Sequence, residues 1–475
     1  MFEQIKRLAK HSAIYGLGGI VSRLLAVLLL PIYTAYLEPD DFGSVGVLIA
    51  LSAVLVTILR GGISSAFFRF YFDSPETAHR LRVLRTSFWF TMASATAGLA
   101  AGVLLAEPIA DALGVGDPWL VRAAFVGIWA QMNYEQLTAL FRVEERSLAF
   151  LAATLANLAV TVAATILLVV VLDWEALGVI VGNWLGTLTV YLALLGYRRE
   201  QLGLQLDRPL LREMQRFGLP LVPAALALIA VNFSDRFFLV HLAGRDEVGV
   251  YELGVRTASA MVLLLTAFRT AWPAFAYSIE DDAEAKRTYS FVLTYLVFVA
   301  SWLALALAAL SPWIVRLLAS DPDYHPGSRV VGLLAFGTAA YAAYIVMAIG
   351  VGRARRTQFN WVIAGAAALV NVALNVLLIP RYEMMGAAVA TVAAYVVLFA
   401  GMTYWAQRVY PVAYQWRRVA TAAGAAVALA LAAKLLDARL PLAVGLALAY
   451  PLVLLPLGFY LPAERERLRA LVRPG

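Results

Sequence analysis

The stretch "AVNFSDRFFLVHLAGRDEVGVYELGVRTAS", residues 230–259, joins two apolar runs through a short polar turn and carries charges inside both runs. Asp235 and Arg236 stand side by side before the turn, and Glu252 and Arg256 follow it four positions apart. A charge at the centre of a bilayer costs roughly 2.5–3.5 kcal/mol on insertion scales. If the two runs cross a membrane, these four side chains therefore need partners or a hydrated cavity.

Composition supports membrane-spanning runs. The chain has 475 residues, of which 62% are hydrophobic and 15% are charged, whereas an ordinary soluble domain is about 25% charged. The chain has no Cys, which excludes disulfides, thiolate nucleophiles and Cys–metal sites. The four His occur at no zinc-motif spacing, and no nucleotide-binding loop is present. A polytopic membrane protein without cofactor or metal is expected, and the net charge of +7 does not indicate nucleic acid.

About fourteen stretches reach the roughly 20 mostly apolar residues that a spanning helix needs. No segment of soluble-domain size separates them. The predicted fold is therefore all-α, with about 14 transmembrane helices. The predicted spans are 12–36, 43–60, 86–106, 119–141, 148–172, 176–197, 218–243, 248–275, 288–310, 330–351, 359–380, 384–407, 417–436 and 440–461.

The distribution of basic residues predicts the orientation. When the loops are numbered alternately, 26 Lys and Arg fall on the side of the N-terminus and six on the other. Cytoplasmic loops carry the excess of Lys and Arg, so both termini are predicted to be cytoplasmic. No small-residue cleavage site follows the basic start, which favours a retained first span over a signal peptide.

The sequence contains an internal repeat. "YLEPDDFGSVGV" resembles "HLAGRDEVGVYELGV", with Gly43 matching Gly249 at an offset of 206. Gly178 matches Gly386 at an offset of 208. Self-similarity at a nearly constant offset indicates a repeated structural unit. Six predicted spans fill this unit, and an even number makes the two copies run the same way through the membrane, as in two-lobed transporters.

The repeat divides the chain into three predicted parts. Residues 1–205 and 206–410 are expected to form two parallel six-helix lobes. Residues 411–475 are expected to add two helices and a basic cytoplasmic tail.

Six basic and three acidic residues remain inside the predicted spans. They are Arg23, Arg60, Arg122, Arg236, Arg256, Arg269, Glu135, Asp235 and Glu252. A long Arg near the end of a span can extend to the headgroups, which suffices for Arg60, Arg122 and Arg269. Arg23 lies about eleven residues, roughly 16 Å, from the start of its span, which is too deep for this explanation.

Two interpretations remain open for the charges on either side of the polar turn. Asp235, Arg236, Glu252 and Arg256 are predicted at similar depths on adjacent helices. They could clasp the two helices by ion pairs, with Glu252 and Arg256 in the favourable acid-first i, i+4 orientation. Alternatively, they line a hydrated cavity with a cationic wall, in which the planar fork of Arg would bind phosphate.

The predicted site follows from these charges. The residues expected to bind an anionic headgroup are Arg23, Arg256, Arg236 and Arg269, with the first two favoured. The residues expected to form ion pairs or to couple an ion are Asp235, Glu252 and Glu135. No catalytic residue is predicted.

Two further groups of acids have simpler interpretations than catalysis or metal binding. Asp40 and Asp41 could serve a membrane-embedded glycosyltransferase or polymerase, but acids also suit the start of a helix. Asp321, Asp323 and His325 could hold a metal, but the surrounding "SDPDYHPGS" is typical of a solvated turn.

Three stretches carry a family resemblance: "SAIYGLGGIVSRLLAVLLLPIYTAYLEPDDFGSVGV", "SDRFFLVHLAGRDEVGVYELGVRTAS" and "NVALNVLLIPRYEMMGAAVATVAAYVV". In order and spacing they resemble the polysaccharide exporter and oligosaccharide flippase branch of the multidrug/oligosaccharidyl-lipid/polysaccharide (MOP) superfamily. The resemblance covers roughly residues 8–410.

The resemblance implies a flippase that is not an enzyme. Its cargo would be an undecaprenyl-pyrophosphate-type lipid-linked oligosaccharide, moved from the inner to the outer leaflet of a bacterial or archaeal cell membrane by alternating access. Arg23 and Arg256 match cavity arginines of relatives that flip lipid-linked peptidoglycan precursor, an alternative cargo. However, "SRLLAV" lacks the Asp that often follows that first Arg.

Other implied partners are membrane lipids, a polysaccharide polymerase and glycosyltransferases of the same pathway. A drug exporter of the same superfamily is a further alternative, although it would favour an acidic cavity.

Overall fold

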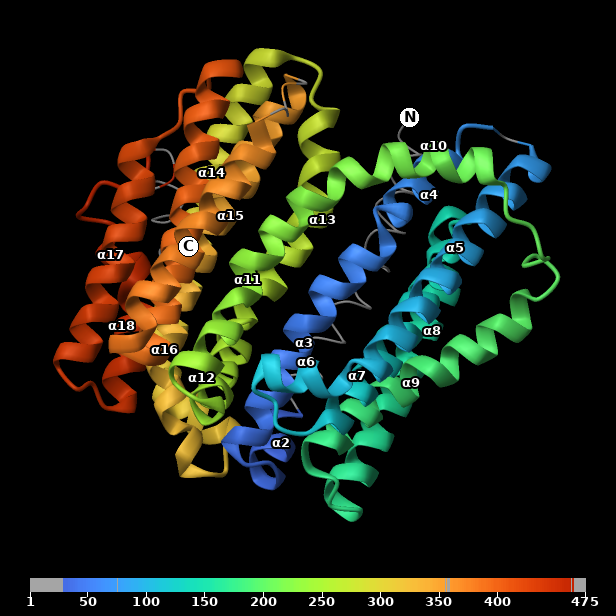
Figure 1. Ribbon diagram of the computed structural model, residues 1–475. Coiled ribbons are helices and arrows are strands. Elements are labelled where there is room, and N and C mark those ends of the chain that lie inside the picture. Colours follow the sequence, from blue (N-terminus) through green and yellow to red (C-terminus); the bar gives the residue numbers. More distant parts are fainter. Residues whose placement is uncertain (1–28, 75, 355, 357–358, 463, 465–475) are drawn as a thin grey trace. The chain divides into compact units, whose positions relative to one another are not determined.

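The computed structural model describes residues 29–74, 76–354, 356, 359–462 and 464, and all regular structure in these ranges is helical (Figure 1). The N-terminal helices are α2 (Leu30–Tyr36), α3 (Pro39–Arg60), α4 (Ile63–Tyr71), α5 (Thr77–Leu104), α6 (Ala106–Leu113), α7 (Pro118–Val143), α8 (Ser147–Ile166), η1 (Leu167–Val171) and α9 (Glu175–Arg198). They are followed by α10 (Arg208–Gly218), η2 (Leu219–Leu221), α11 (Val222–Leu242), α12 (Arg245–Ala258), α13 (Ala260–Ser278), α14 (Asp282–Leu318), η3 (Pro322–Gly327), α15 (Ser328–Arg353), α16 (Asn360–Val409), α17 (Trp416–Leu435) and α18 (Leu440–Val453).

The predicted spans from 43–60 onward each correspond to described helix. The span 248–275 is divided into α12 and α13 at Ser259, whose Oγ donates to the Arg256 carbonyl at 2.6 Å. The spans 359–380 and 384–407 both lie in α16, which is kinked at Glu383 (φ 49°, ψ −129°) just after Pro380. Helix α18 ends at Val453, short of the predicted 461. Most of the first predicted span, 12–36, lies outside the described residues.

The helix surfaces show that this is a multi-pass membrane protein. Within the described ranges, nine helices are long and apolar enough to cross a membrane. Leu104, Leu148 and Leu369 are 83%, 71% and 72% exposed. Soluble proteins rarely leave large contiguous apolar surfaces in water, whereas lipid covers them without cost.

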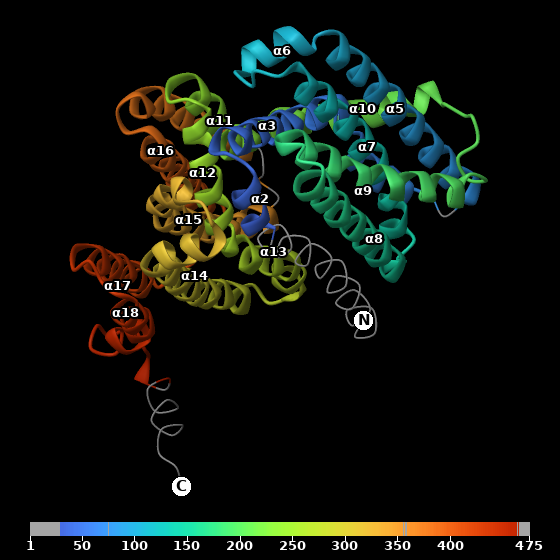
Figure 2. The same ribbon diagram turned by 90° about the horizontal axis from the view of Figure 1, so that it is seen from below.

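The chain forms two compact units. The first comprises Met1–Leu253, Leu318–Tyr324 and Ala367–Ala390. In it α5, α7, α8 and α9 lie side by side, as Figure 2 shows, and α11 packs on α3. Phe67 of α4, Phe88 of α5, Leu140 of α7 and Tyr191 of α9 share its buried core. This unit therefore contains α11 and most of α12 together with the N-terminal helices.

The second unit comprises Gly254–Leu317, His325–Ala366 and Thr391–Gly475. Trp272 of α13, Tyr289 of α14 and Met347 of α15 lie in one buried cluster. Phe298 of α14 stacks on Tyr450 of α18 with ring centroids 5.5 Å apart. Aromatic packing thus fixes the C-terminal helices to α14. The division predicted from the repeat, at residues 205 and 410, stays a prediction.

Glycines of the predicted repeat lie at close approaches between backbones. A Cβ at Gly43 would lie 2.1 Å from the Arg245 carbonyl oxygen, and one at Gly249 would lie 1.8 Å from that of Pro39. Gly43 therefore contacts Arg245, four positions before Gly249, and Gly249 contacts Pro39, four positions before Gly43. Close approach through small residues is typical of helix packing in membranes, and here it lets α3 and α12 cross symmetrically.

Candidate functional site

Arg236 lies in a buried charged cluster between α11 and α12. Its Nη1 is 2.7 Å from Asp235 Oδ1, and its Nη2 is 3.1 Å from Glu252 Oε2. Nη1 also donates to the Asn232 carbonyl at 2.8 Å, and the Tyr251 hydroxyl donates to Asp235 Oδ2 at 2.6 Å. Arg236 is only 4% exposed. A buried charge is stable when its hydrogen-bonding capacity is satisfied in this way.

This geometry gives Arg236 two carboxylate partners. Although the side chains of Asp235 and Arg236 leave the helix about 100° apart, the long guanidinium reaches both Asp235 and Glu252. Ion pairs therefore join α11 and α12, as one of the two interpretations of residues 230–259 predicted. Binding of an anion by Arg236 and ion coupling by Asp235 or Glu252 stay predictions.

The other predicted arginines are in different settings. Arg256 is half-buried near the end of α12, and Arg269 is exposed on α13. Arg23 lies outside the described residues. The anion-binding roles of these three residues stay predictions.

Glu135 of α7 is paired with a residue that was expected to extend to the headgroups. Arg60 Nη1 of α3 lies 2.7 Å from Glu135 Oε2, and Gln131 Nε2 donates to Glu135 Oε1 at 2.9 Å. The Arg60 side chain is 16% exposed. Arg60 therefore joins two helices of the first unit.

A buried polar group beside Asp235 was missed by sequence reasoning. Ser234 Oγ donates to Asn371 Oδ1 at 2.7 Å, and Asn375 Nδ2 donates to the same oxygen at 3.2 Å. Both asparagines are fully buried on α16. The sequence does contain an indication of this group, because Asn371 and Asn375 are two polar residues one helical turn apart within an apolar span.

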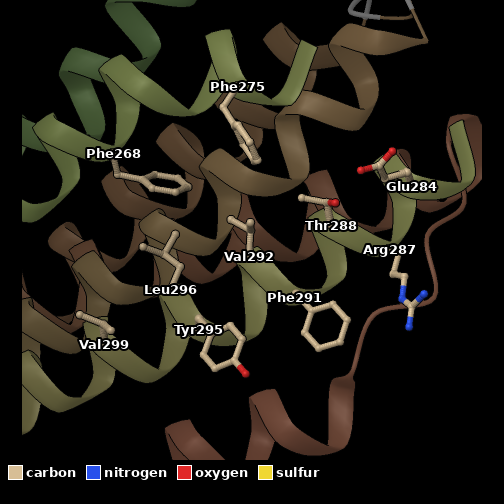
Figure 3. Close-up of a pocket in the computed structure, with 10 residues that line it drawn as sticks. All are labelled: Phe268, Phe275, Glu284, Arg287, Thr288, Phe291, Val292, Tyr295, Leu296 and Val299. Carbon is tan, nitrogen blue, oxygen red and sulfur yellow. The ribbon is translucent and has the colours of Figure 1, made fainter. Parts of the chain in front are cut away.

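The second unit carries an apolar groove along α14, drawn in Figure 3. Its volume is about 810 Å³, and α13 contributes Phe268 and Phe275. Most of the lining residues follow one another along α14, and Glu284 and Arg287 lie at one end of them in Figure 3. The residues contributed by α14 are Glu284, Arg287, Thr288, Phe291, Val292, Tyr295, Leu296 and Val299. The groove is thus apolar along its length and charged at one end.

Asp40, Asp321 and Asp323, which were considered for catalysis or metal binding, make local structural contacts. Asp40 Oδ1 pairs with Arg245 Nε at 2.7 Å, and Asp41 lies with it in the first turn of α3. Asp321 Oδ1 accepts from the Asp323 backbone N–H at 3.0 Å, which is the geometry of a turn. In the described part of the chain, no group of three or more His, Cys, Asp or Glu is placed to hold a metal.

Solved structures of low sequence identity share this fold. One is "Lipid II flippase MurJ, inward closed conformation", with a TM-score of 0.73 and 12% identity over 93% of this chain and 98% of that chain. Another is an inward-facing multidrug resistance MATE family transporter of the MOP superfamily, with a TM-score of 0.69 and 12% identity over 82% of this chain and 97% of that chain. A MOP superfamily transporter from Pyrococcus furiosus has a TM-score of 0.58 and 13% identity over 85% and 95%. No curated protein matches the chain.

The helical architecture and these similarities define the class: the chain has the fold of the MOP superfamily. A family model for MatE matches residues 220–377, in agreement with this class. The model described as "Polysaccharide biosynthesis protein" matches residues 8–279, more than half of the chain. The chain belongs to this family.

Proposed function

We propose that this protein is a flippase that moves a lipid-linked oligosaccharide, of the undecaprenyl-pyrophosphate type, from the inner to the outer leaflet by alternating access. It makes and breaks no covalent bond. The observation that carries the proposal is the groove along α14, because its apolar walls fit a long hydrocarbon chain and Arg287 at one end can meet an anionic headgroup.

The dimensions of the groove suit a lipid tail. From Glu284 to Val299, α14 rises by roughly 22 Å, which exceeds half of the hydrocarbon core of about 30 Å. Phe268, Phe291 and Val292 offer the apolar surface that an isoprenoid chain would cover. Exposed Arg287, at one end, can form charge-assisted bonds with phosphate. The groove therefore suits a lipid chain that lies along one leaflet.

The pyrophosphate would bind deeper arginines during transport. Arg23 and Arg256 are the first candidates, with Arg269 as a further contact. Arg236 is held by Asp235 and Glu252, so its main role in the proposed mechanism is to keep α11 and α12 together. Asp235 would be the coupling group if an ion drives the cycle.

The test is transport in liposomes that contain the purified protein and a fluorescent lipid-linked oligosaccharide. Val292→Trp and Val299→Trp fill the groove and should reduce transport to the rate of protein-free liposomes. Leu317→Trp is the matched control, because Leu317 lies on the same helix, outside the groove lining, and is 80% exposed. Full transport by both groove variants would contradict the proposal.

Lipid-linked peptidoglycan precursor is a second candidate cargo, supported by the structural similarity to a lipid II flippase over 93% of this chain. The same liposomes can compare lipid-linked peptidoglycan precursor with lipid-linked oligosaccharide. We expect faster transport of the oligosaccharide, in line with the family. Faster transport of the precursor would reverse this assignment.

A further inference from the structure

A second pocket lies in the first unit, at the end that the charge pattern predicts to face outward. Its volume is about 600 Å³. The start of α3 contributes Asp41 and Ser44, and the turn before α7 contributes Val115–Asp117. The turn that leads into α9 contributes Asp173–Leu177. Together with Arg245 at the start of α12, four segments that are distant in sequence thus line one pocket within a single compact unit.

The charges of this pocket are unbalanced. Among the residues that the structure describes, Arg245 is the single basic one in the lining. Its guanidinium is already engaged by Asp40 at 2.7 Å and by the Val115 carbonyl at 2.7 Å. Four carboxylates line the pocket and form no ion pair within the described ranges. They are Asp41, Asp117, Asp173 and Glu175. The lining therefore attracts a positively charged group.

Ser44 gives an independent indication of a ligand. It lines the pocket, is 2% exposed, and makes no hydrogen bond to any residue that the structure describes. Roughly nine in ten buried polar groups have a hydrogen-bond partner, and a helical Ser ordinarily bonds the carbonyl one turn before it. The Ser44 hydroxyl is therefore available to a polar group inside the pocket.

Trp174 adds an aromatic surface between two of the carboxylates. It lines the pocket and is 44% exposed. Its neighbours Asp173 and Glu175 have left-handed φ values of 55° and 47°. An indole ring can stack on a sugar face or attract a cation.

The shape of the pocket favours an organic ligand over a metal ion. None of the described acids belong to a group of three or more that could hold a metal. Its volume falls within the range of roughly 300–1,000 Å³ that is typical of small-molecule sites. A ligand that combines a cationic amine, hydroxyl groups and a ring face would use every part of the lining.

We propose that this pocket binds an amino sugar, with its ammonium group beside Asp41 and Glu175, its ring on Trp174 and a hydroxyl on Ser44. This site goes beyond the proposed transport and does not depend on it. Binding requires no transport cycle, so the two proposals fail separately.

The experiment is isothermal titration of the full-length protein in detergent with glucosamine and with N-acetylglucosamine, which has the same ring but no charge. Glucosamine should bind at least about tenfold more tightly, and high salt should weaken it because the charges are partly exposed. Asp41→Asn and Glu175→Gln should each weaken binding by about five- to tenfold. Asp111→Asn, an exposed acid outside the pocket lining, should leave the affinity unchanged.

Several outcomes would overturn the proposal. Equal affinity for both sugars would show that no cation is recognised, and absence of glucosamine binding would remove the site. Calcium binding that is lost in the same two variants would identify a metal site instead. Thermal unfolding of each variant verifies folding, and Trp174→Ala, at a half-exposed position, provides a second variant that should also weaken glucosamine binding.

Discussion

At the scale of single residues, the main feature is a buried guanidinium with two carboxylates. Asp235 and Glu252 both contact Arg236, and Tyr251 donates to Asp235. Removing one member of a buried ion pair leaves an uncompensated charge, which costs more than the pair contributes. The sequence placed these residues at similar depths, but the choice of partners required side-chain geometry.

The first prediction concerns Arg236. Arg236→Gln should destabilise the protein by about 3–5 kcal/mol, because Asp235 and Glu252 would remain buried without their cation. The measurement is thermal unfolding in detergent. Arg381→Gln, at an exposed position, is the control and should change stability by less than about 0.5 kcal/mol. Similar stability of both variants would contradict the clasp.

A second residue-scale prediction concerns pH. Burial alone would raise the pKa of Glu464, but donation from the Tyr295 hydroxyl and the Leu461 backbone, together with Arg418, lowers the pKa below its usual 4.5. A lowered carboxyl pKa contributes stability above the unfolded pKa, and this contribution is lost as pH falls through the folded value. Thermal unfolding measured between about pH 6 and 3 should show this loss. The loss should be smaller in Glu464→Gln than in Glu280→Gln, a control at an exposed site.

At the scale of elements, the crossing of α3 and α12 depends on two glycines of the repeat. Any side chain at Gly43 or Gly249 would overlap a carbonyl of the other helix. Sequence comparison identified these glycines as equivalent positions. It did not predict that they pack against each other, because an internal repeat gives no distance between its copies.

The third prediction tests this crossing. Gly43→Val and Gly249→Val should each cost about 1–3 kcal/mol through overpacking and should separate the two helices. Since the chain has no Cys, cysteines introduced at Asp40 and Arg245 can report the separation by crosslinking. Gly196→Val is the control, because nothing lies within 4 Å of a Cβ there. Unchanged crosslinking in both variants would show that the glycines do not set the approach.

At the scale of the whole molecule, the chain is a multi-pass helical membrane protein whose orientation stays a prediction. Two exposed positions test it: Leu204, predicted on the cytoplasmic side, and Asp111, predicted outside. In intact cells, a membrane-impermeant maleimide should label Asp111→Cys but not Leu204→Cys. The opposite labelling would invert the topology derived from the basic residues.

The sequence by itself determined the positions of the helices, the repeat and the charges inside the spans. These properties depend on local composition, because a spanning helix satisfies its backbone hydrogen bonds within its own segment. The predicted spans from 43–60 onward therefore correspond to helices, apart from the break at Ser259 and the shorter α18.

Only the tertiary structure decided which side chains meet. Arg236 is held by Glu252 across 16 positions, Ser234 bonds Asn371 across 137, and Arg60 pairs with Glu135 on another helix. The groove along α14 and the pocket around Trp174 are also assembled from separate segments. Hydropathy and spacing define the faces of one helix, whereas partners and cavities depend on how several helices pack.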